Sequence, residues 1–332
     1  MRGKRLVLAA VAACILAAVL LAVLTPYPVS ALTRLLFQKS PATEPPGFSQ
    51  MWEAVRVTAD AIYPSLHADN TADIYTPKER SGPWPVVLWV HGGAYVGGDK
   101  GDVAIYATAL ASRGYAVVAM NYCRAPEGRY PGPLVQIGEA LRWMVDAAGI
   151  YGFDMEQVIL AGDSAGAHMA AQVAALETSA DYAAALGLEP VTEPGSIRAV
   201  LLFCGPYDVE QVADIEHPLL RFFMDRAAWA YFGISDWAEV YAEEATVARH
   251  VTAGFPPAFI SDGNSGSFET QGRVLAAALE GKGVRVETHF IPLEAGTAGH
   301  EYQFLLDDPL AQEAFEKAVA FLAEILSSSQ AS

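Results

Sequence analysis

The segment around Ser164 has the residue types and spacing expected of an enzymatic nucleophile. Residues 162–166 (GDSAG) form a G-x-S-x-G pattern that follows an apolar run and opens an alanine-rich helical stretch. A serine on a sharp turn between strand and helix presents its hydroxyl outward, and it needs flanking glycines because side chains would collide there. The amino end of the helix adds backbone donors and a positive dipole. The pattern therefore predicts that Ser164 is a nucleophile; the alternative is a glycine turn with a helix-capping serine.

A second glycine-rich segment, residues 91–95 (HGGAY), also follows an apolar run. Its two glycines let the backbone bend so that amide groups point into a cleft, where they and the amide of Ala165 can hold an oxyanion. Both segments follow predicted strands, and open α/β sheets place their sites at the carboxyl ends of strands. We expect His91 to order this loop by hydrogen bonding, since it precedes Ser164 and the candidate base lies at the other end of the chain.

Strand-like and helix-like patterns alternate from about residue 84. The strands and helices that they predict would position these two segments. Continuous apolar runs are typical of parallel strands that are covered on both faces. The candidate strands are 85–90, 115–120, 157–161, 197–203, 257–261 and 285–291. The candidate helices are 103–112, 134–148, 165–177, 270–279 and 312–326. This alternation predicts a mostly parallel sheet with helices on both faces. The aromatic-rich stretch 208–251 interrupts it and fits a helical cap inserted over the carboxyl ends of the strands.

From about Val86 to its end, the chain resembles the α/β hydrolases of the hormone-sensitive-lipase type, which are esterases and lipases. The resemblance rests on four motifs in order, which are His91-Gly92-Gly93, residues 121–127 (NYCRAPE), residues 162–166 (GDSAG) and Gly299-His300. It implies an α/β-hydrolase fold with Ser164 as nucleophile and His300 as general base. His300 lies past the last predicted strand in a glycine-containing loop.

The resemblance also implies an oxyanion hole made by the amides of Gly93, Ala94 and Ala165. Ala94 stands where many relatives have a third glycine, which an amide donor tolerates.

The acid that should orient the histidine departs from the family pattern. Relatives place an aspartate three residues beyond the glycine that matches Gly263, and here that position is Gly266. Glu269 has a longer reach and starts a helix from the same loop, so we predict that it is the acid. Asp262, at the end of the strand, is the alternative, and Asp208, after the preceding strand, is a third candidate. These carboxylates could instead only cap the loop or favour the first turn of a helix.

Acyl transfer to water is the reaction that these residues predict. His300 takes the proton of Ser164, Ser164 attacks an ester carbonyl, and water hydrolyses the acyl-enzyme. The sequence has no H-E-x-x-H, C-x-x-C or P-loop pattern, so we expect neither a metal nor a cofactor. A hydrolase of amide or peptide bonds, or a catalytically inactive extracellular binding module, are the alternatives. Five aromatic residues of the insertion suit an apolar acyl pocket or the packing of the cap: Phe222, Phe223, Trp229, Tyr231 and Phe232.

Composition and charge limit the partners. Of the 332 residues, 52% are hydrophobic and 18% charged, which requires a compact globular body. The formal charge of −17 repels phosphates, so we expect no binding of nucleic acid. The expected partners are a small-molecule or lipid ester and, through the N-terminal segment, a membrane.

The N-terminal segment has the pattern of a signal anchor. Basic residues precede the uncharged run Leu6–Leu24, which is long enough to cross a bilayer. We predict a transmembrane segment over 1–31, a Pro-rich linker over 32–47 and a hydrolase domain over 48–332 that lies outside the cytoplasm. Cleavage after residues 29–31 is the alternative and would release a secreted protein.

The three cysteines do not form a disulfide framework. Cys14 lies in the predicted anchor. If Cys123 and Cys204 follow the fourth and sixth strands of the α/β-hydrolase fold, about three strand spacings separate them, which is beyond disulfide reach. We therefore expect both to be free thiols.

Overall fold

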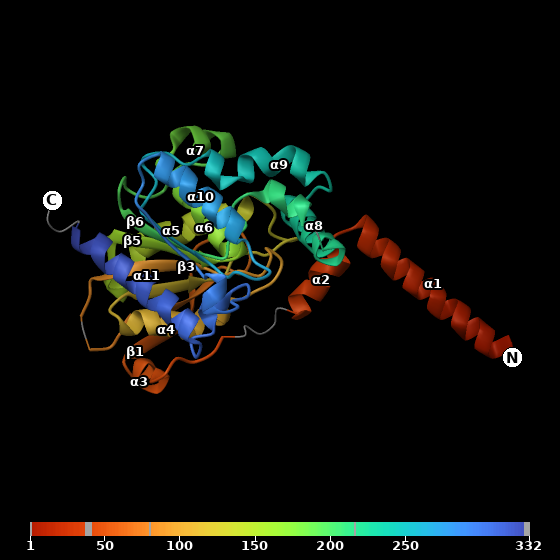
Figure 1. Cartoon of the computed structure of the whole chain (residues 1–332), viewed down its shortest axis with the longest axis horizontal. Coiled ribbons are helices and arrows are strands. Elements are labelled where there is room, and N and C mark those ends of the chain that lie inside the picture. Colours follow the sequence, from red (N-terminus) through yellow and green to blue (C-terminus); the bar gives the residue numbers. More distant parts are fainter. Residues whose placement is uncertain (1, 37–41, 80, 216, 329–332) are drawn as a thin grey trace.

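A mostly parallel sheet forms the centre of the chain (Figure 1). The computed structural model describes residues 2–36, 42–79, 81–215 and 217–328. In this part of the chain the sheet has eight strands in the order β1-β2-β4-β3-β5-β6-β7-β8. The strands are β1 Val55–Ile62, β2 Thr71–Pro77, β3 Trp84–Val90, β4 Ala116–Met120, β5 Phe153–Asp163, β6 Ile197–Phe203, β7 Ala258–Asp262 and β8 Val286–Phe290. Strands β3 to β8 pair in parallel, whereas β2 is antiparallel to both β1 and β4.

The six predicted strands are confirmed as the parallel part of the sheet. Their continuous apolar runs send alternate side chains into two separate cores. In β3, Val86, Leu88 and Val90 belong to one core, while Val87 and Trp89 belong to the other. The antiparallel strands β1 and β2 were not predicted.

Helices cover both faces of the sheet, as predicted. Helices α5 (Gly132–Tyr151), α6 (Ala165–Thr178) and α10 (Glu269–Gly281) pack on the first core, and α4 (Ala104–Ser112) and α11 (Pro309–Ser328) pack on the second. Two short helices, α3 (Phe48–Glu53) and α7 (Ala180–Leu186), complete this part of the fold. The chain thus has the α/β-hydrolase fold.

The predicted insertion lies between β6 and β7 and is helical. It contains α8 (Pro218–Phe232), α9 (Trp237–Ala245) and 3₁₀ turns at Val209–Asp214 and Val247–Arg249. Gly233, with a φ of 81°, ends α8 in the left-handed conformation that glycine adopts without strain. The insertion places α8 beside the carboxyl ends of the strands.

The N-terminal segment forms two helices, α1 (Arg2–Leu24) and α2 (Tyr27–Leu36). Helix α1 extends away from the body (Figure 1), and its apolar stretch is not buried in the protein. Helix α2 packs against α8, and Arg34 of α2 donates hydrogen bonds to the carbonyls of Val96 (2.7 Å) and Ala125 (2.6 Å). Helix α2 therefore crosses the predicted boundary between anchor and linker. Residues 37–41 of the predicted linker lie outside the described residues.

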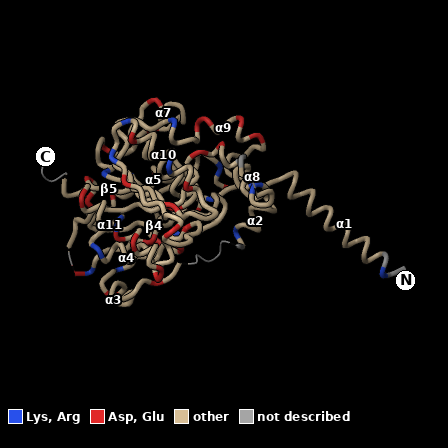
Figure 2. The backbone as a smooth tube through the Cα atoms, viewed as in Figure 1, with Lys and Arg blue, Asp and Glu red and all other residues tan. Residues whose placement is uncertain are grey.

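The distribution of charged residues and the free state of the cysteines agree with the sequence analysis. Figure 2 shows acidic residues spread over the body and a basic residue near the free end of α1. Cys123 and Cys204 are buried free thiols that follow β4 and β6, so this prediction is confirmed.

Candidate active site

Ser164 lies on a strained turn between β5 and α6. Its φ of 51° and ψ of −122° are unusual for a residue with a side chain. Neighbouring glycines make the turn possible, because a Cβ on Gly162 would lie 2.5 Å from the backbone of Gly166, and one on Gly166 would lie 2.0 Å from the Val90 carbonyl oxygen. The local sequence thus forces the tight turn that the G-x-S-x-G pattern predicts.

His300 reaches Ser164 from the loop that follows β8. Its Nε2 atom lies 2.9 Å from the Ser164 hydroxyl oxygen, although 136 residues separate the two. The ring packs edge-on against Phe268, with ring centroids 5.4 Å apart. Desolvation lowers the pKa of His300 to about 4, which leaves the imidazole neutral and able to accept a proton at physiological pH.

The other ring nitrogen of His300 faces a residue that the sequence did not single out. Nδ1 lies 2.8 Å from the hydroxyl oxygen of Ser267. Ser267 directly follows Gly266, the position at which the family resemblance leads us to expect an aspartate. Gly266 adopts a φ of 61°, a left-handed turn that precedes Ser267.

Asp262 lies behind Ser267 at the end of β7. Its side chain is only 1% exposed, and neither carboxylate oxygen has a partner of ordinary hydrogen-bond geometry among the described residues. Burial raises the pKa of Asp262 to about 6, and the nearby Ser267 hydroxyl partly opposes this rise. Asp262 is therefore a buried carboxylate whose neighbouring donor also contacts His300.

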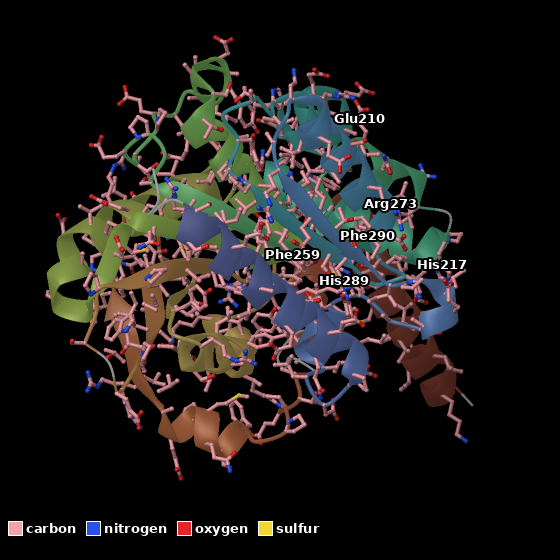
Figure 3. All side chains as sticks on the ribbon, turned by 60° about the vertical axis from the view of Figure 1, so that its left-hand side comes forward. Glu210, His217, Phe259, Arg273, His289 and Phe290 are labelled. Carbon is pink, nitrogen blue, oxygen red and sulfur yellow. The ribbon has the colours of Figure 1, made fainter. Side chains whose placement is uncertain are left out.

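Glu269, the predicted acid, is not brought to His300. It lies in the first turn of α10 and forms an ion pair of 2.6 Å with Arg273, one helical turn further on. The Arg273 guanidinium lies 4.4 Å from the centroid of the Phe290 ring, and Figure 3 shows these two residues close together. The helix start directs Glu269 toward this cation, so the expected contact is corrected to one between His300 and Ser267.

Asp208, the third candidate acid, also has other partners. Its carboxylate accepts hydrogen bonds from the amide of Glu210 (3.1 Å), the Gln211 side chain (3.0 Å) and the Thr246 hydroxyl (3.3 Å). Asp208 caps a 3₁₀ turn of the insertion.

The loop after β3 presents unpaired amides beside Ser164. Gly93 and Ala94 have φ values of 109° and 52°, and a Cβ on Gly93 would lie 2.4 Å from Gly97. Among the described residues, no acceptor is found for the amides of Gly93 and Ala94. The amide of Ala165 is at the first position of α6, where it has no partner within the helix. His91 lies in the same loop, and its Nδ1 atom is 2.7 Å from the Gly92 carbonyl oxygen.

Two buried carboxyl groups join the loops that surround Ser164. Asp163 accepts hydrogen bonds of 2.7 Å from the Trp89 indole and from the Gly92 amide. Burial raises the pKa of Asp163 to about 6, and burial together with the neighbouring Asp163 carboxylate holds the pKa of Glu301 well above its usual range, which favours a shared proton between the two side chains. These contacts join the turn at Ser164 to the oxyanion loop and to the loop of His300. Asp163 lies within the G-x-S-x-G motif and Glu301 directly follows His300, and these positions are the sequence signal that could have identified them.

A cavity of about 500 Å³ opens beside Ser164 and His300. Its apolar lining comes from Ile215, from Leu220 and Met224 on α8, and from Phe268. The five aromatic residues considered for an acyl pocket are not among its described lining residues. Instead, the rings of Tyr231 and Phe232 are buried in the core.

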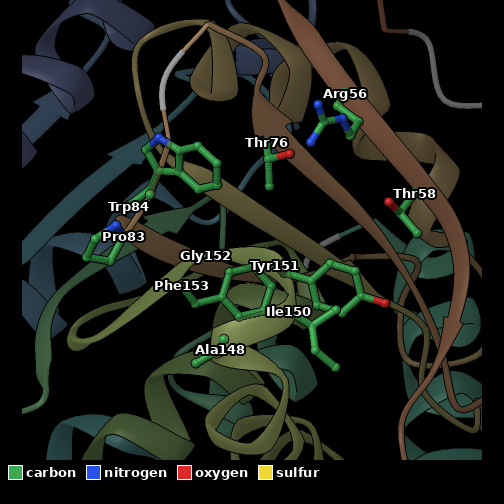
Figure 4. Close-up of a pocket in the computed structure, with 12 residues that line it drawn as sticks. Arg56, Thr58, Thr76, Pro83, Trp84, Ala148, Ile150, Tyr151, Gly152 and Phe153 are labelled. Carbon is green, nitrogen blue, oxygen red and sulfur yellow. The ribbon is translucent and has the colours of Figure 1, made fainter.

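A second hollow, of about 660 Å³, lies at the opposite edge of the sheet (Figure 4). It is bordered by Trp84 at the start of β3, by Tyr151 at the end of α5 and by Phe153 at the start of β5. Its described lining residues include no serine, histidine or cysteine.

Comparisons with known proteins agree with this arrangement. The BD-FAE family model matches residues 72–272, more than half of the chain. A probable isoprenylcysteine alpha-carbonyl methylesterase of Oryza sativa subsp. japonica is 31% identical over 52% of this chain and 42% of its own length. The carboxylesterase NlhH of Mycobacterium tuberculosis is 28% identical over 78% of this chain and 79% of its own length. The chain spans about half the length, or less, of several other curated relatives that it matches.

A solved structure extends the comparison. Esterase B from Lactobacillus rhamnosis, inhibited by a tributyrin phosphonate, superposes with a TM-score of 0.73 and 25% identity. The match covers 88% of this chain and 90% of that one.

Proposed function

The chain belongs to the BD-FAE family and has the α/β-hydrolase fold, and from this premise we propose that it hydrolyses carboxylic esters through an acyl-enzyme on Ser164. The observation that carries the proposal is the 2.9 Å contact between the Ser164 hydroxyl and His300 Nε2, made at a strained strand-to-helix turn. The names of NlhH and of esterase B support ester bonds as the substrate class.

Proton transfer follows from the order of contacts around His300. Nε2 accepts the Ser164 proton, so Nδ1 carries hydrogen and donates it to the Ser267 oxygen. The Ser267 hydroxyl is then free to donate to Asp262. As Ser164 attacks the ester carbonyl, the imidazole becomes positively charged, and the Asp262 carboxylate stabilises this charge through Ser267.

The oxyanion of the tetrahedral intermediate is held by the amides of Gly93, Ala94 and Ala165. Two of these amides have no acceptor among the described residues, and the third stands at the amino end of α6. Donors fixed in this way need no reorganisation when the charge develops. After the alcohol leaves, His300 activates a water molecule that hydrolyses the acyl-enzyme.

The N-terminal helix α1 serves, in this proposal, as a membrane anchor with the catalytic body outside the cytoplasm. By length and composition its stretch Leu6–Leu24 is apolar enough to cross a bilayer. Basic residues at its amino end favour a cytoplasmic start.

Ester hydrolysis is tested with the full chain and p-nitrophenyl butyrate. Ser164→Ala should lower kcat by at least about 10³-fold and abolish labelling by a fluorophosphonate, because the hydroxyl supplies the covalent step. Ser196→Ala is the matched control, since this serine lies in an exposed turn before β6. Activity of Ser164→Ala within tenfold of the parent chain would refute the assignment. A labelled serine without ester turnover would favour another acyl substrate, such as an amide.

A further inference from the structure

The carboxyl end of α1 is fastened to the cap helix α8. Arg226 of α8 donates hydrogen bonds to the carbonyls of Ala22 (3.0 Å) and Val23 (2.9 Å). These carbonyls belong to the last turn of α1, where they have no partner within the helix. Helix α2 then packs along α8, so the anchor ends on the cap (Figure 1).

The length of α1 places Arg226 at the level of the lipid headgroups. The 19 residues of Leu6–Leu24 rise about 28 Å at 1.5 Å per residue, close to the hydrocarbon thickness of a bilayer. The membrane surface therefore lies near Leu24, one residue from the carbonyl that Arg226 binds. The rings of Phe222 and Trp229 each lie 5.0 Å from the Arg226 guanidinium. Aromatic rings beside an arginine are typical of this interfacial layer.

An apolar surface extends from the region of Arg226 along helices α2 and α8. Leu35 of α2 and Leu219 of α8 are each 60% exposed, and Leu220 is 47% exposed. We call this surface, defined by the exposed Leu35 and Leu219 and the partly exposed Phe222 and Trp229, the α2–α8 face. Leu220, which follows Leu219 in α8, lines the cavity beside Ser164, so the mouth of the cavity lies next to the face.

Two arginines next to the α2–α8 face form ion pairs. Arg34 forms an ion pair with Glu127, and Arg226 forms one of 2.8 Å with Asp225. Pairing lowers the free-energy penalty for bringing these carboxylates to a surface of low polarity.

We infer that the α2–α8 face rests on the bilayer that holds α1, and that the cavity takes long-chain esters directly from this bilayer. The inference rests on the proposed ester hydrolysis and on the proposed anchor, and it names the substrate class as esters dissolved in lipid. The ester carbonyl reaches Ser164, and the acyl chain lies along Leu220 and Met224 in the cavity. Water cleaves the acyl-enzyme, which yields a fatty acid and an alcohol.

The test compares two substrates for the full chain in phosphatidylcholine vesicles. One is 4-methylumbelliferyl oleate dissolved in the bilayer, and the other is water-soluble p-nitrophenyl acetate. Leu219→Glu puts a charge on the α2–α8 face without touching the cavity lining, and should slow oleate cleavage about tenfold because burying the new carboxylate in lipid is unfavourable. Cleavage of the acetate ester should not change. Ile150→Glu is the matched control, since Ile150 is 79% exposed at the far end of α5 and should alter neither rate.

A second measurement does not depend on catalysis. Phosphatidylcholine brominated near the headgroup should quench the part of the fluorescence that Trp229→Phe removes. Equal rates of oleate cleavage for Leu219→Glu and the parent chain, or the absence of this quenching, would overturn the inference. If the parent chain cleaves neither ester, the proposed function fails, and the quenching alone decides whether the face contacts lipid.

Discussion

Replacing Ser267 by alanine should slow ester hydrolysis while changing KM little. The substitution removes the partner that lies 2.8 Å from His300 Nδ1 and the donor next to Asp262. A hydrogen bond to a charged group contributes about 1.5 to 3 kcal/mol, which corresponds to roughly 10- to 150-fold in kcat. The effect should be smaller than the loss of about 10⁴-fold that follows when a directly bonded triad acid is disabled.

The assay measures kcat and KM for p-nitrophenyl butyrate with three variants. Ser265→Ala is the control, because this serine is exposed in the same loop. Glu269→Gln should change kcat less than about threefold, since its carboxylate pairs with Arg273 on the surface of α10. Ser267→Ala within threefold of the parent chain, or a large loss in Glu269→Gln, would show that the relay through Ser267 is wrong.

The dependence of kcat/KM on pH tests the role of Asp262 in the same relay. The pKa of this carboxyl is raised to about 6, so it carries its charge above pH 6 and loses it as the pH falls through that value. Because the charge stabilises the imidazolium, kcat/KM should fall on the acid side of pH 6, and again near pH 4 where His300 itself becomes protonated. Asp262→Asn should be slower and should keep only the step near pH 4. An unchanged step near pH 6 in this variant would refute the reasoning.

Three further results are expected. Gly93→Ala should lower kcat by roughly 10²- to 10³-fold, because its Cβ would lie 2.4 Å from Gly97 and displace the oxyanion loop. Ala94→Gly should stay active, and circular dichroism checks that both variants fold. Asp262→Asn should raise the free energy of unfolding by up to about 3 kcal/mol at pH 7.5, because burial penalises the charged form of Asp262. At pH 4 the substitution should change the free energy of unfolding little, and thermal melts at both pH values measure the difference. The chain should stay in the membrane pellet after alkaline extraction and its body should be cut by protease added to intact cells; a mature N-terminus near residue 32 would contradict the anchor.

The parallel part of the fold could be predicted because burial on both faces leaves a simple pattern. Strands β3 to β7 lie between helices, so each contains a short continuous apolar run. Strand β8, at the other edge, is only partly buried and includes Glu287 and Thr288. The antiparallel strands β1 and β2 lack this signature. Strand β1 is at the edge of the sheet and exposes residues such as Arg56 and Asp60, which interrupt the apolar pattern.

The contact between Ser164 and His300 could be predicted from sequence because backbone geometry dictates the residues around both. The turn at Ser164 requires glycines at 162 and 166, and the fold places the base after the last strand. The acid obeys no such rule. Its identity depends on which side chain reaches Nδ1 of His300, and Glu269 was favoured for its length although the start of α10 directs it to Arg273.

The proposed relay through Ser267 would explain why a buried carboxylate without an ordinary hydrogen bond is present at the end of β7. Burial raises the pKa of Asp262, so its charged form lowers the free energy of unfolding at neutral pH. The same lack of partners leaves the carboxylate available to the Ser267 hydroxyl, and through it to the imidazolium that forms at His300. With glycine at 266, no carboxylate can occupy the usual place of the acid, and a hydroxyl group is long enough to bridge the gap. The charge of Asp262 thus lowers the free energy of unfolding, and in the proposed mechanism the same charge stabilises the transition state.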